Sequence, residues 1–209
     1  QLKKTKNELF EKHKAFDLIQ RLLVWFIQYG PKTKRWFWRV WYNVFAKRSA
    51  HYDFKFMNYG YIEHGFSPKL DPDDEKERYP AQLYNHTASQ ENVFGKNVLE
   101  IGSGRGGGAM HVLKYLKPET IVGIDISKEA IRLCDSFYKA PGLSFMIGDS
   151  ENLPFKNNTF DVVINVESSH CYGNIPQFLS EVQRVLNPNG FFLWADFRTR
   201  NEMDMVFNL

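Results

Sequence analysis

The chain has 209 residues, and 43% of them are hydrophobic. This suffices for one domain with a core and an appendage, whereas two full domains would be crowded. The net charge of +3 is unevenly spread, because residues 1–50 hold 12 Lys and Arg against three acidic residues, a balance of +9 that leaves −6 for the rest. With only Cys134 and Cys171 and no secretory or stop-transfer segment, the sequence argues against a disulfide framework, and a reducing, cytoplasmic setting is the default expectation.

Residues 1–50 predict a basic, aromatic extension with two helices, at about 7–29 and 33–47, separated at "YGPKTK". Neither helix can cross a bilayer, because charged side chains interrupt both apolar runs well before about 20 residues. Aromatic rings interleaved with Lys and Arg are typical of a helix lying in a membrane interface. Two compatible interpretations stay open: the rings cap the main domain over a hydrophobic substrate, or residues 15–48 contact a membrane peripherally.

Residues 51–92 predict a connector and a lead-in helix. The stretch "HYDFKFMNYGYIEHGFSPKLDPDDEKERYP" is rich in Tyr, Gly, Pro and charge, and predicts about 30 irregular residues. A loop of this length is usually functional or disordered, and its aromatic content argues against disorder. The following "AQLYNHTASQENVF" resumes helical spacing.

Residues 93–209 predict an α/β domain. Apolar strands are expected at 97–101, 120–125, 143–148, 160–166 and 189–197, and helices at 108–116, 127–140 and 175–186, the second opened by Ser127 as N-cap. Mostly continuous apolar strands alternating with helices predict a doubly wound, Rossmann-like parallel sheet with helices on both faces. Ligands of such sheets bind beyond the C-terminal strand ends.

A glycine-rich loop follows the first strand. Gly102, Gly104 and Gly107 satisfy G-x-G-x-x-G, and Asp125 ends the next strand where an acid can accept hydrogen bonds from ribose hydroxyls. Glycine is needed where φ is positive or where a Cβ would strike a ligand. The pattern alone fits either a dinucleotide or S-adenosylmethionine.

Five motifs in order favour the second cofactor. "VLEIGSGRGGG", "GIDIS", "GDSENLPF" and "FDVVINVESSHCY" resemble the four motifs of the class I methyltransferases, and "EVQRVLNPNGFFLWAD" resembles the helix, turn and strand that follow them. The family completes its sheet with two further strands, one of them antiparallel. This chain ends about a dozen residues after the fifth strand, so those strands are expected to be absent from it.

The resemblance implies S-adenosylmethionine as cofactor, with S-adenosylhomocysteine as product. It places Gly102, Ser103 and Gly104 near the methionine part, Asp125 on the ribose, Ile126 on the adenine face and Asp149 on the adenine amino group. The implied set also includes Glu100, Ser150 and Asn165.

Simpler interpretations compete with several of these assignments. Asp125 and Asp149 are both placed where an acid commonly begins an Asx-type turn. Glu151 is expected to cap the following turn, Arg105 to be a solvated loop cation, and His111 to be an ordinary side chain of the first helix. No spacing of Cys and His predicts a metal site.

Methyl transfer requires donor and acceptor to be held in line, and a hydroxyl acceptor also benefits from a general base. His170 follows the fourth strand and has the ordinary pKa near 6.5 that suits this role. Glu167 is expected to orient its ring, with Cys171 and Tyr172 lining the same pocket and Cys171 forming no covalent intermediate. The alternative is that His170 is only a satisfied loop residue.

The acceptor is suggested by a narrower resemblance. "YNHTASQ", "NVESSHCY" and "ADFR" are similar to the mycobacterial methyltransferases that O-methylate phthiotriol-type lipids and to their polyketide relatives, over about residues 55 to 200. This implies a hydroxyl on a hydrophobic small molecule, lipid or polyketide. "NYGYIEHG" matches an aromatic lid segment of small-molecule methyltransferases, which implies that Tyr59 and Tyr61 close over the methionine end. Residues 1–50 match no motif of the family.

Other functions stay open. A C- or N-methyltransferase on a quinone-like ring is the main alternative, a nicotinamide-dependent oxidoreductase is more distant, and a membrane-peripheral scaffold is disfavoured by the complete cofactor motifs. Nucleic acid is not an expected partner, because "NVES" stands where an Asn/Asp-Pro-Pro-aromatic tetrapeptide would be expected. The sequence does not predict an oligomeric state.

Overall fold

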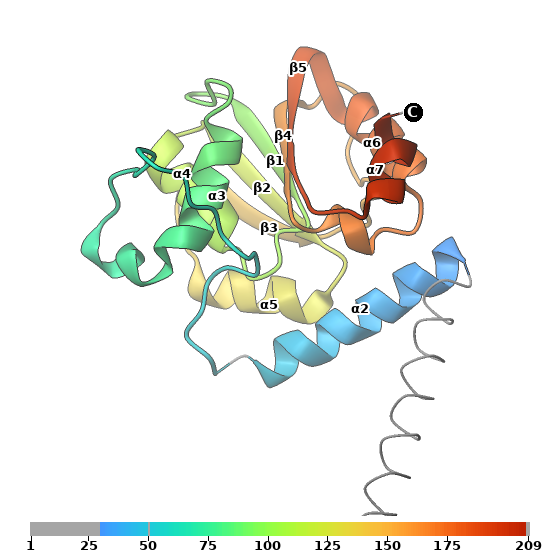
Figure 1. Cartoon of the computed structure of the whole chain (residues 1–209), viewed down its shortest axis with the longest axis horizontal. Coiled ribbons are helices and arrows are strands. Elements are labelled where there is room, and N and C mark those ends of the chain that lie inside the picture. Colours follow the sequence, from blue (N-terminus) through green and yellow to red (C-terminus); the bar gives the residue numbers. More distant parts are fainter. Residues whose placement is uncertain (1–29, 50, 208–209) are drawn as a thin grey trace, which may run out of the picture.

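The computed structural model describes residues 30–49 and 51–207 (Figure 1). The first predicted helix, residues 7–29, lies outside the described residues. The described elements are α2 Pro31–Arg48, η1 Pro72–Glu77, α3 Arg78–Ala88, β1 Asn97–Ile101, α4 Gly107–Leu116, β2 Thr120–Asp125, α5 Lys128–Phe137, β3 Leu143–Ile147, β4 Phe160–Val166, η2 Ser169–Cys171, α6 Ile175–Val185, β5 Leu186–Ala195 and α7 Arg200–Phe207. None of these helices is long and apolar enough to span a membrane.

All five strands are parallel, in the order β3-β2-β1-β4-β5. The chain moves outward from β1 to β3 and then returns to place β4 on the other side of β1, so the strand order reverses between β1 and β4. Ligands of such sheets bind beyond the C-terminal strand ends at this reversal. The predicted α/β fold with a parallel sheet is confirmed, and no sixth strand occurs among the described residues.

Each face of the sheet buries its own apolar cluster, because successive strand residues point to opposite faces. Val98 of β1 belongs to the cluster that includes Tyr84 of α3 and Val112 of α4. Leu99, the next residue, belongs to the cluster that includes Phe178 of α6. Figure 1 shows α3 and α4 on one side of the sheet and α6 on the other.

The helix boundaries have local causes. Ser127 caps α5 as predicted, its hydroxyl accepting from the Ala130 N–H at 3.2 Å. The strand predicted for 189–197 instead begins at Leu186, directly after α6. The predicted Asn-Pro-x-Gly turn forms an irregularity within β5, where Asn189 takes a φ of 66°. Asn tolerates this left-handed conformation better than most residues, and bulges absorb such extra residues.

The connector is irregular from residue 53 to residue 71, but regular structure resumes earlier than predicted, with η1 and then α3 at Arg78. Ion pairs hold it against α4: the Asp74 carboxylate accepts from Lys55 at 2.8 Å and from Lys114 at 2.7 Å. The connector is therefore a fixed part of the domain.

The prediction that Arg105 is a solvated loop cation is wrong. Its side chain is buried, and its guanidinium donates to the carbonyl oxygens of Phe54 at 2.7 Å, Ser49 at 3.1 Å and Tyr52 at 3.0 Å. It also lies 4.2 Å from the Phe54 ring centroid. The glycine loop thus anchors the segment between α2 and the connector through this cation, which is not solvated.

Helix α2 lies alongside α5 (Figure 1), and it also contacts η2. Asn43 fixes it there, because its side-chain oxygen accepts from the Ser127 hydroxyl at 2.9 Å and from the Glu129 N–H at 3.3 Å. The described part of the N-terminal extension therefore packs on the main domain as a cap.

Candidate active site

A cavity lies at the C-terminal ends of β1, β2 and β4, beneath α2. Its empty volume is about 890 Å³, counting the part open to solvent. One side is built from the glycine loop and the loops after β2, β3 and β4. The other side consists of the inner face of α2, which we define as Arg35, Trp38, Tyr42, Phe45 and Ala46.

The glycine loop forms the floor of the cavity. Gly102 has a φ of +78°, and a Cβ there would lie 2.1 Å from the Ser168 hydroxyl oxygen, so no larger residue fits. The N–H groups of Gly102 and Ser103 both donate to the Ile124 carbonyl, at 2.8 and 2.9 Å. The loop is thus held against the end of β2, which leaves an open surface for a ligand.

Asp125 ends β2 and lines the cavity. One carboxylate oxygen accepts from the Gly104 N–H at 2.9 Å and the other from the Ser127 N–H at 2.8 Å. Burial raises the pKa of this carboxyl and these N–H groups oppose the rise. The Asx-type turn of the simpler interpretation is therefore present, yet each oxygen keeps a lone pair with which to accept from a ligand hydroxyl.

Asp149 lines the same cavity together with Ile126 and Ser150. It too begins an Asx-type turn, accepting from the Glu151 N–H at 3.0 Å. Its other oxygen accepts from the Arg35 guanidinium of α2 at 3.0 Å. Sequence analysis missed Arg35, because only the packing of α2 brings it to the end of β3.

Glu151 also belongs to the cavity wall, which the sequence did not predict. One carboxylate oxygen accepts from Arg35 at 3.2 Å, and the other accepts from the N–H groups of Gly173 and Asn174 at 2.8 and 3.0 Å. It therefore ties α2 to the loop that precedes α6.

Three predicted cofactor residues lie beneath the cavity surface and do not line it. Glu100 is fully buried near Tyr84 of α3, and burial raises the pKa of its carboxyl to about 7. Ser103 is buried within the loop. The Asn165 amide lies within hydrogen-bond distance of the Ile101 carbonyl, at 2.8 Å, and so supports the ends of β1 and β4 from below.

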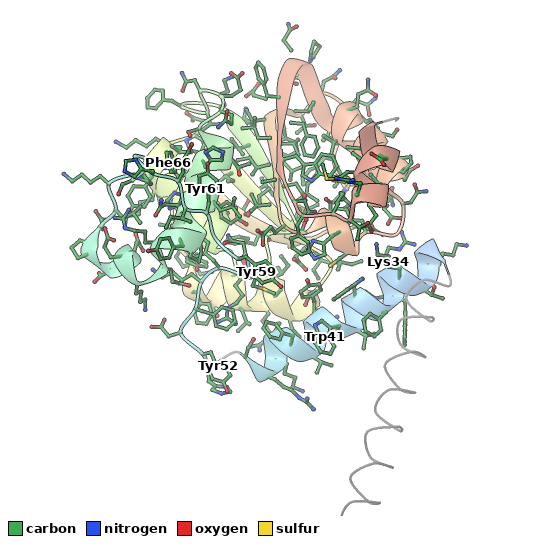
Figure 2. The ribbon with its side chains drawn as sticks, in the orientation of Figure 1. Lys34, Trp41, Tyr52, Tyr59, Tyr61 and Phe66 are labelled. Atoms are coloured by element: carbon green, nitrogen blue, oxygen red, sulfur yellow. The ribbon has the colours of Figure 1, made fainter. Side chains whose placement is uncertain are left out.

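The predicted lid residues are also placed elsewhere. Tyr59 is 86% exposed, and its N–H donates to Glu167 at 2.9 Å. Tyr61 stacks on His86 with ring centroids 4.2 Å apart, because its N–H is bonded to the Tyr79 carbonyl of α3 (Figure 2). Met57 is the connector residue that lines the cavity.

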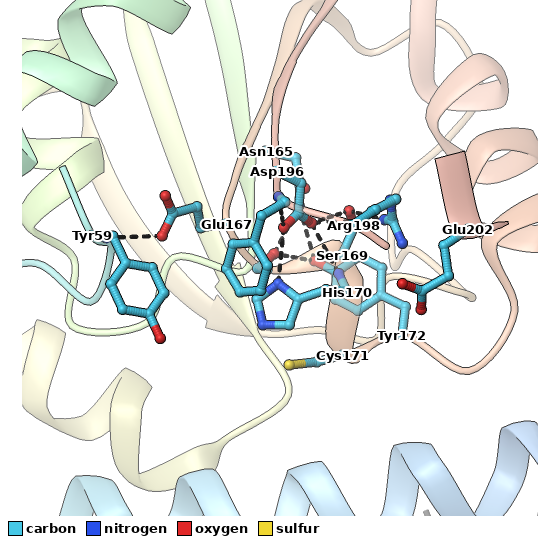
Figure 3. A network of polar contacts seen from close by, with 12 residues as sticks. Tyr59, Asn165, Glu167, Ser169, His170, Cys171, Tyr172, Asp196, Arg198 and Glu202 are labelled. Atoms are coloured by element: carbon cyan, nitrogen blue, oxygen red, sulfur yellow. Dashed lines mark hydrogen bonds and ion pairs between the residues drawn. The ribbon is translucent and has the colours of Figure 1, made fainter. Parts of the chain in front are cut away.

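His170 lies in η2 beside the cavity and faces the end of β5 (Figure 3). Its Nδ1 is 2.9 Å from one oxygen of Asp196, and its backbone N–H donates to the other oxygen at 2.9 Å. Burial disfavours the charged form of the ring and so lowers its pKa, but the hydrogen bond to Asp196 outweighs burial and raises the pKa of His170 to about 9. The Phe197 ring packs on the imidazole with centroids 4.3 Å apart.

The predicted partner of His170 is corrected. Glu167 lines the cavity, but its carboxylate accepts from the Tyr59 N–H and makes no hydrogen bond with His170. Asp196 takes that place because η2 turns the ring toward β5. The Asp196 carboxylate also accepts from the Ser169 hydroxyl. Burial raises the pKa of Asp196, but the hydrogen bonds from His170 and Ser169 outweigh burial and lower it.

Cys171 and Tyr172 line the cavity, as predicted, whereas His170 is not among its lining residues. The Cys171 sulfur lies 3.5 Å from the Tyr42 hydroxyl of α2. Within the described ranges, no group of three or more His, Cys, Asp and Glu side chains is placed to hold a metal ion.

Two methyltransferases are similar to this chain in sequence. The chain is 42% identical over 167 residues to the phthiotriol/phenolphthiotriol dimycocerosates methyltransferase of Mycobacterium leprae, covering 79% of this chain and 62% of that protein. It is 43% identical over 163 residues to a fatty-acid O-methyltransferase of Mycolicibacterium smegmatis, covering 78% of this chain and 60% of that protein. The chain thus spans less than two thirds of the length of these relatives.

Solved structures show the same fold. The YcgJ protein from Bacillus subtilis is similar at a TM-score of 0.53 and 27% identity, over 60% of this chain and 55% of that one. The cyclase SpnF is similar at a TM-score of 0.59 and 18% identity, over 72% of this chain and 55% of that one, which shows the fold alone. Residues 99–194 match the family model described as a methyltransferase domain. That part of the chain is therefore a methyltransferase domain with the class I fold.

Proposed function

We propose that the cavity binds S-adenosylmethionine and that the protein transfers its methyl group to a hydroxyl of a hydrophobic small molecule, lipid or polyketide. One observation carries the proposal: Gly102, Asp125 and Asp149, which follow or end β1, β2 and β3, line one cavity under an aromatic helix. The printed names of the relatives, a phthiotriol-lipid methyltransferase and a fatty-acid O-methyltransferase, support this class of acceptor.

The residues present fit this cofactor. Asp125 would accept from the ribose hydroxyls with its remaining lone pairs, and Ile126 would pack on the adenine. Asp149 would accept from the adenine amino group beside the Arg35 contact. Trp38 and Phe45 would cover the cofactor and keep water out. When bound, S-adenosylmethionine supplies an electrophilic methyl group, and the chain holds the acceptor in line with it.

His170 would take the proton from the acceptor hydroxyl. Because Nδ1 is bonded to Asp196, the other ring nitrogen, Nε2, is the one left to accept this proton. Asp196 would fix the ring orientation and stabilise the imidazolium that forms. With a pKa of about 9, the ring is mostly protonated at neutral pH, so activity is expected to rise with pH as His170 loses its proton.

C- or N-methylation of a ring compound is the alternative. The His170–Asp196 pair favours a hydroxyl over an amine, because a neutral amine already has a nucleophilic lone pair, whereas a hydroxyl becomes a good nucleophile when a base takes its proton.

Calorimetric titration of the full chain with S-adenosylhomocysteine and, in parallel, with NAD(H) tests the cofactor. Binding of the first alone supports the proposal, whereas binding of NAD(H) alone would assign the cavity to a dinucleotide. Transfer of labelled methyl groups to hydroxylated fatty acids and phenols, compared with matched amines, then tests the acceptor atom.

A further inference from the structure

Helix α2 has two different faces. Its inner face lines the cavity. Its outer face, which we define as Arg39, Val40, Trp41, Val44, Lys47 and Arg48, is exposed. Val40, Trp41 and Val44 are 41%, 53% and 44% exposed, so three apolar side chains lie in water beside three cations.

The position of α2 leaves this face accessible among the described elements. In Figure 1 the helix forms one margin of the domain, and no other labelled element lies beyond it. The Trp41 side chain belongs to this helix (Figure 2). The Trp41 ring stacks on Phe37 with centroids 6.4 Å apart, which restricts its motion while leaving it exposed.

The charge of α2 has a single sign. Residues 31–48 contain six Lys and Arg and no Asp or Glu. Two of the six are directed inward: Arg35 pairs with Asp149 and Glu151, and Lys34 is partly buried near Cys171. The remaining four, Lys32 and the three cations of the outer face, are exposed.

A shallow hollow extends this basic surface toward the sheet. Lys32, Arg35 and Arg39 line it on the α2 side, and Ile126 and Ile147 line it on the side of the strand ends. Because Arg35 already pairs with Asp149, Lys32 and Arg39 are the cations available there to an added anionic group.

We propose that the outer face of α2 docks on an anionic lipid bilayer. Cations attract anionic headgroups, while Trp41, Val40 and Val44 enter the headgroup boundary, as in interfacial helices. A second copy of the chain fits less well, because a twofold contact through this face would bring its like charges together. The inference does not depend on methyl transfer, although docking would place the cavity under α2 beside a source of hydrophobic acceptors.

Co-sedimentation of the full chain with vesicles tests this proposal. Vesicles of phosphatidylcholine alone are compared with vesicles that also contain phosphatidylglycerol. We expect binding to the anionic vesicles that weakens as salt is added. The double variant Arg39→Glu/Lys47→Glu should bind at least about 10-fold more weakly, and Trp41→Ser should also weaken binding.

The matched control is Lys69→Glu/Lys156→Glu, which makes the same change in net charge at two exposed lysines outside α2. It should bind the vesicles nearly as the original chain does. Retained binding of S-adenosylhomocysteine by all variants would show that the cavity is intact, so that failure of docking and failure of the proposed function are distinguished.

Three results would overturn the inference. The first is no binding of the original chain to anionic vesicles. The second is unchanged binding of both α2 variants, which would place the contact elsewhere in the chain. The third is equal loss of binding in the lysine control, which would show that binding depends on the net charge of the chain and not on α2.

Discussion

The substitution Asp196→Asn tests the assignment of His170 as the base. Asp196 accepts from both the ring Nδ1 and the backbone N–H of His170. Asparagine preserves the shape, and its side-chain oxygen can still accept from Nδ1. It removes the negative charge, and its amide nitrogen cannot accept from the backbone N–H of His170. The substitution therefore keeps the packing and the ring contact while it removes the charge and one backbone hydrogen bond.

The structure sets the expected magnitude. The pKa of His170 is about 9, against an ordinary value of 6.5, which corresponds to about 3 kcal/mol of preference for the imidazolium. If half or all of this preference is present in the transition state, its loss slows the pH-independent rate by about 10-fold or about 200-fold, respectively. Without the Asp196 charge, burial dominates, and the pKa of His170 should fall to its ordinary value or below.

The two effects oppose each other at neutral pH. In the original chain, about 1% of His170 is unprotonated at pH 7, so kcat/KM should rise with pH and level off above about 9. In Asp196→Asn the rise should occur at lower pH, and the plateau should be lower. The variant would therefore lose least activity near neutrality and most at alkaline pH.

The assay is the initial rate of labelled methyl transfer across this pH range, with S-adenosylhomocysteine affinity measured in parallel. Asp135→Asn, an exposed acid-to-amide change on α5, is the matched control and should leave the profile unchanged. His170→Ala should remove the pH-dependent rise and lower turnover by about 10²-fold or more. An unshifted rise in Asp196→Asn would refute the reasoning, and full activity in His170→Ala would return that residue to a structural role.

Three further predictions concern the cofactor side and the scaffold. Asp125→Ala should weaken S-adenosylhomocysteine binding by about 1–3 kcal/mol, and unchanged affinity in calorimetry would contradict the ribose assignment. Arg105→Leu should lower the free energy of unfolding by about 1.5–3 kcal/mol in urea titration, because three carbonyl groups lose their donor, whereas Arg132→Leu on the surface should have little effect. Glu100 has a pKa raised to about 7, so the folded state keeps a proton that the unfolded state loses, and the free energy of unfolding should fall as pH rises from about 4.5 to 7. Glu100→Gln should remove this fall, and parallel pH profiles of the two proteins would contradict it.

The sequence alone brings Gly102, Asp125 and Asp149 to one cavity, because their positions follow from local structure. A strand, a glycine turn and a helix follow one another within 20 residues, and the turn itself requires Gly102 to have a positive φ. Asp125 and Asp149 lie at strand ends, and parallel strands bring those ends to one edge. Spacing along the chain is therefore enough to place these residues in one cavity.

The other side depends on contacts between distant segments. Local sequence predicts that Arg105 is solvated, and it is buried because Ser49, Tyr52 and Phe54 lie over the glycine loop. Asp196 lies 26 residues after His170 and reaches it only through the pairing of β4 with β5. Tyr61 belongs to the same aromatic segment as Tyr59, yet its backbone N–H donates to the Tyr79 carbonyl, which holds Tyr61 against α3. The spacing of residues along the sequence does not predict these contacts.

The fold does not determine which reaction the cavity supports. The cyclase SpnF shares the architecture at a TM-score of 0.59, so the parallel sheet by itself does not specify a reaction. In our proposal, the glycine loop and the strand-end acids bind the cofactor. The residues to which we assign the proton transfer, His170 in η2 and Asp196 after β5, come from two segments joined by packing. Evidence about the reaction must therefore come from these residues, because a change in the acceptor can arise among them while every cofactor motif stays intact.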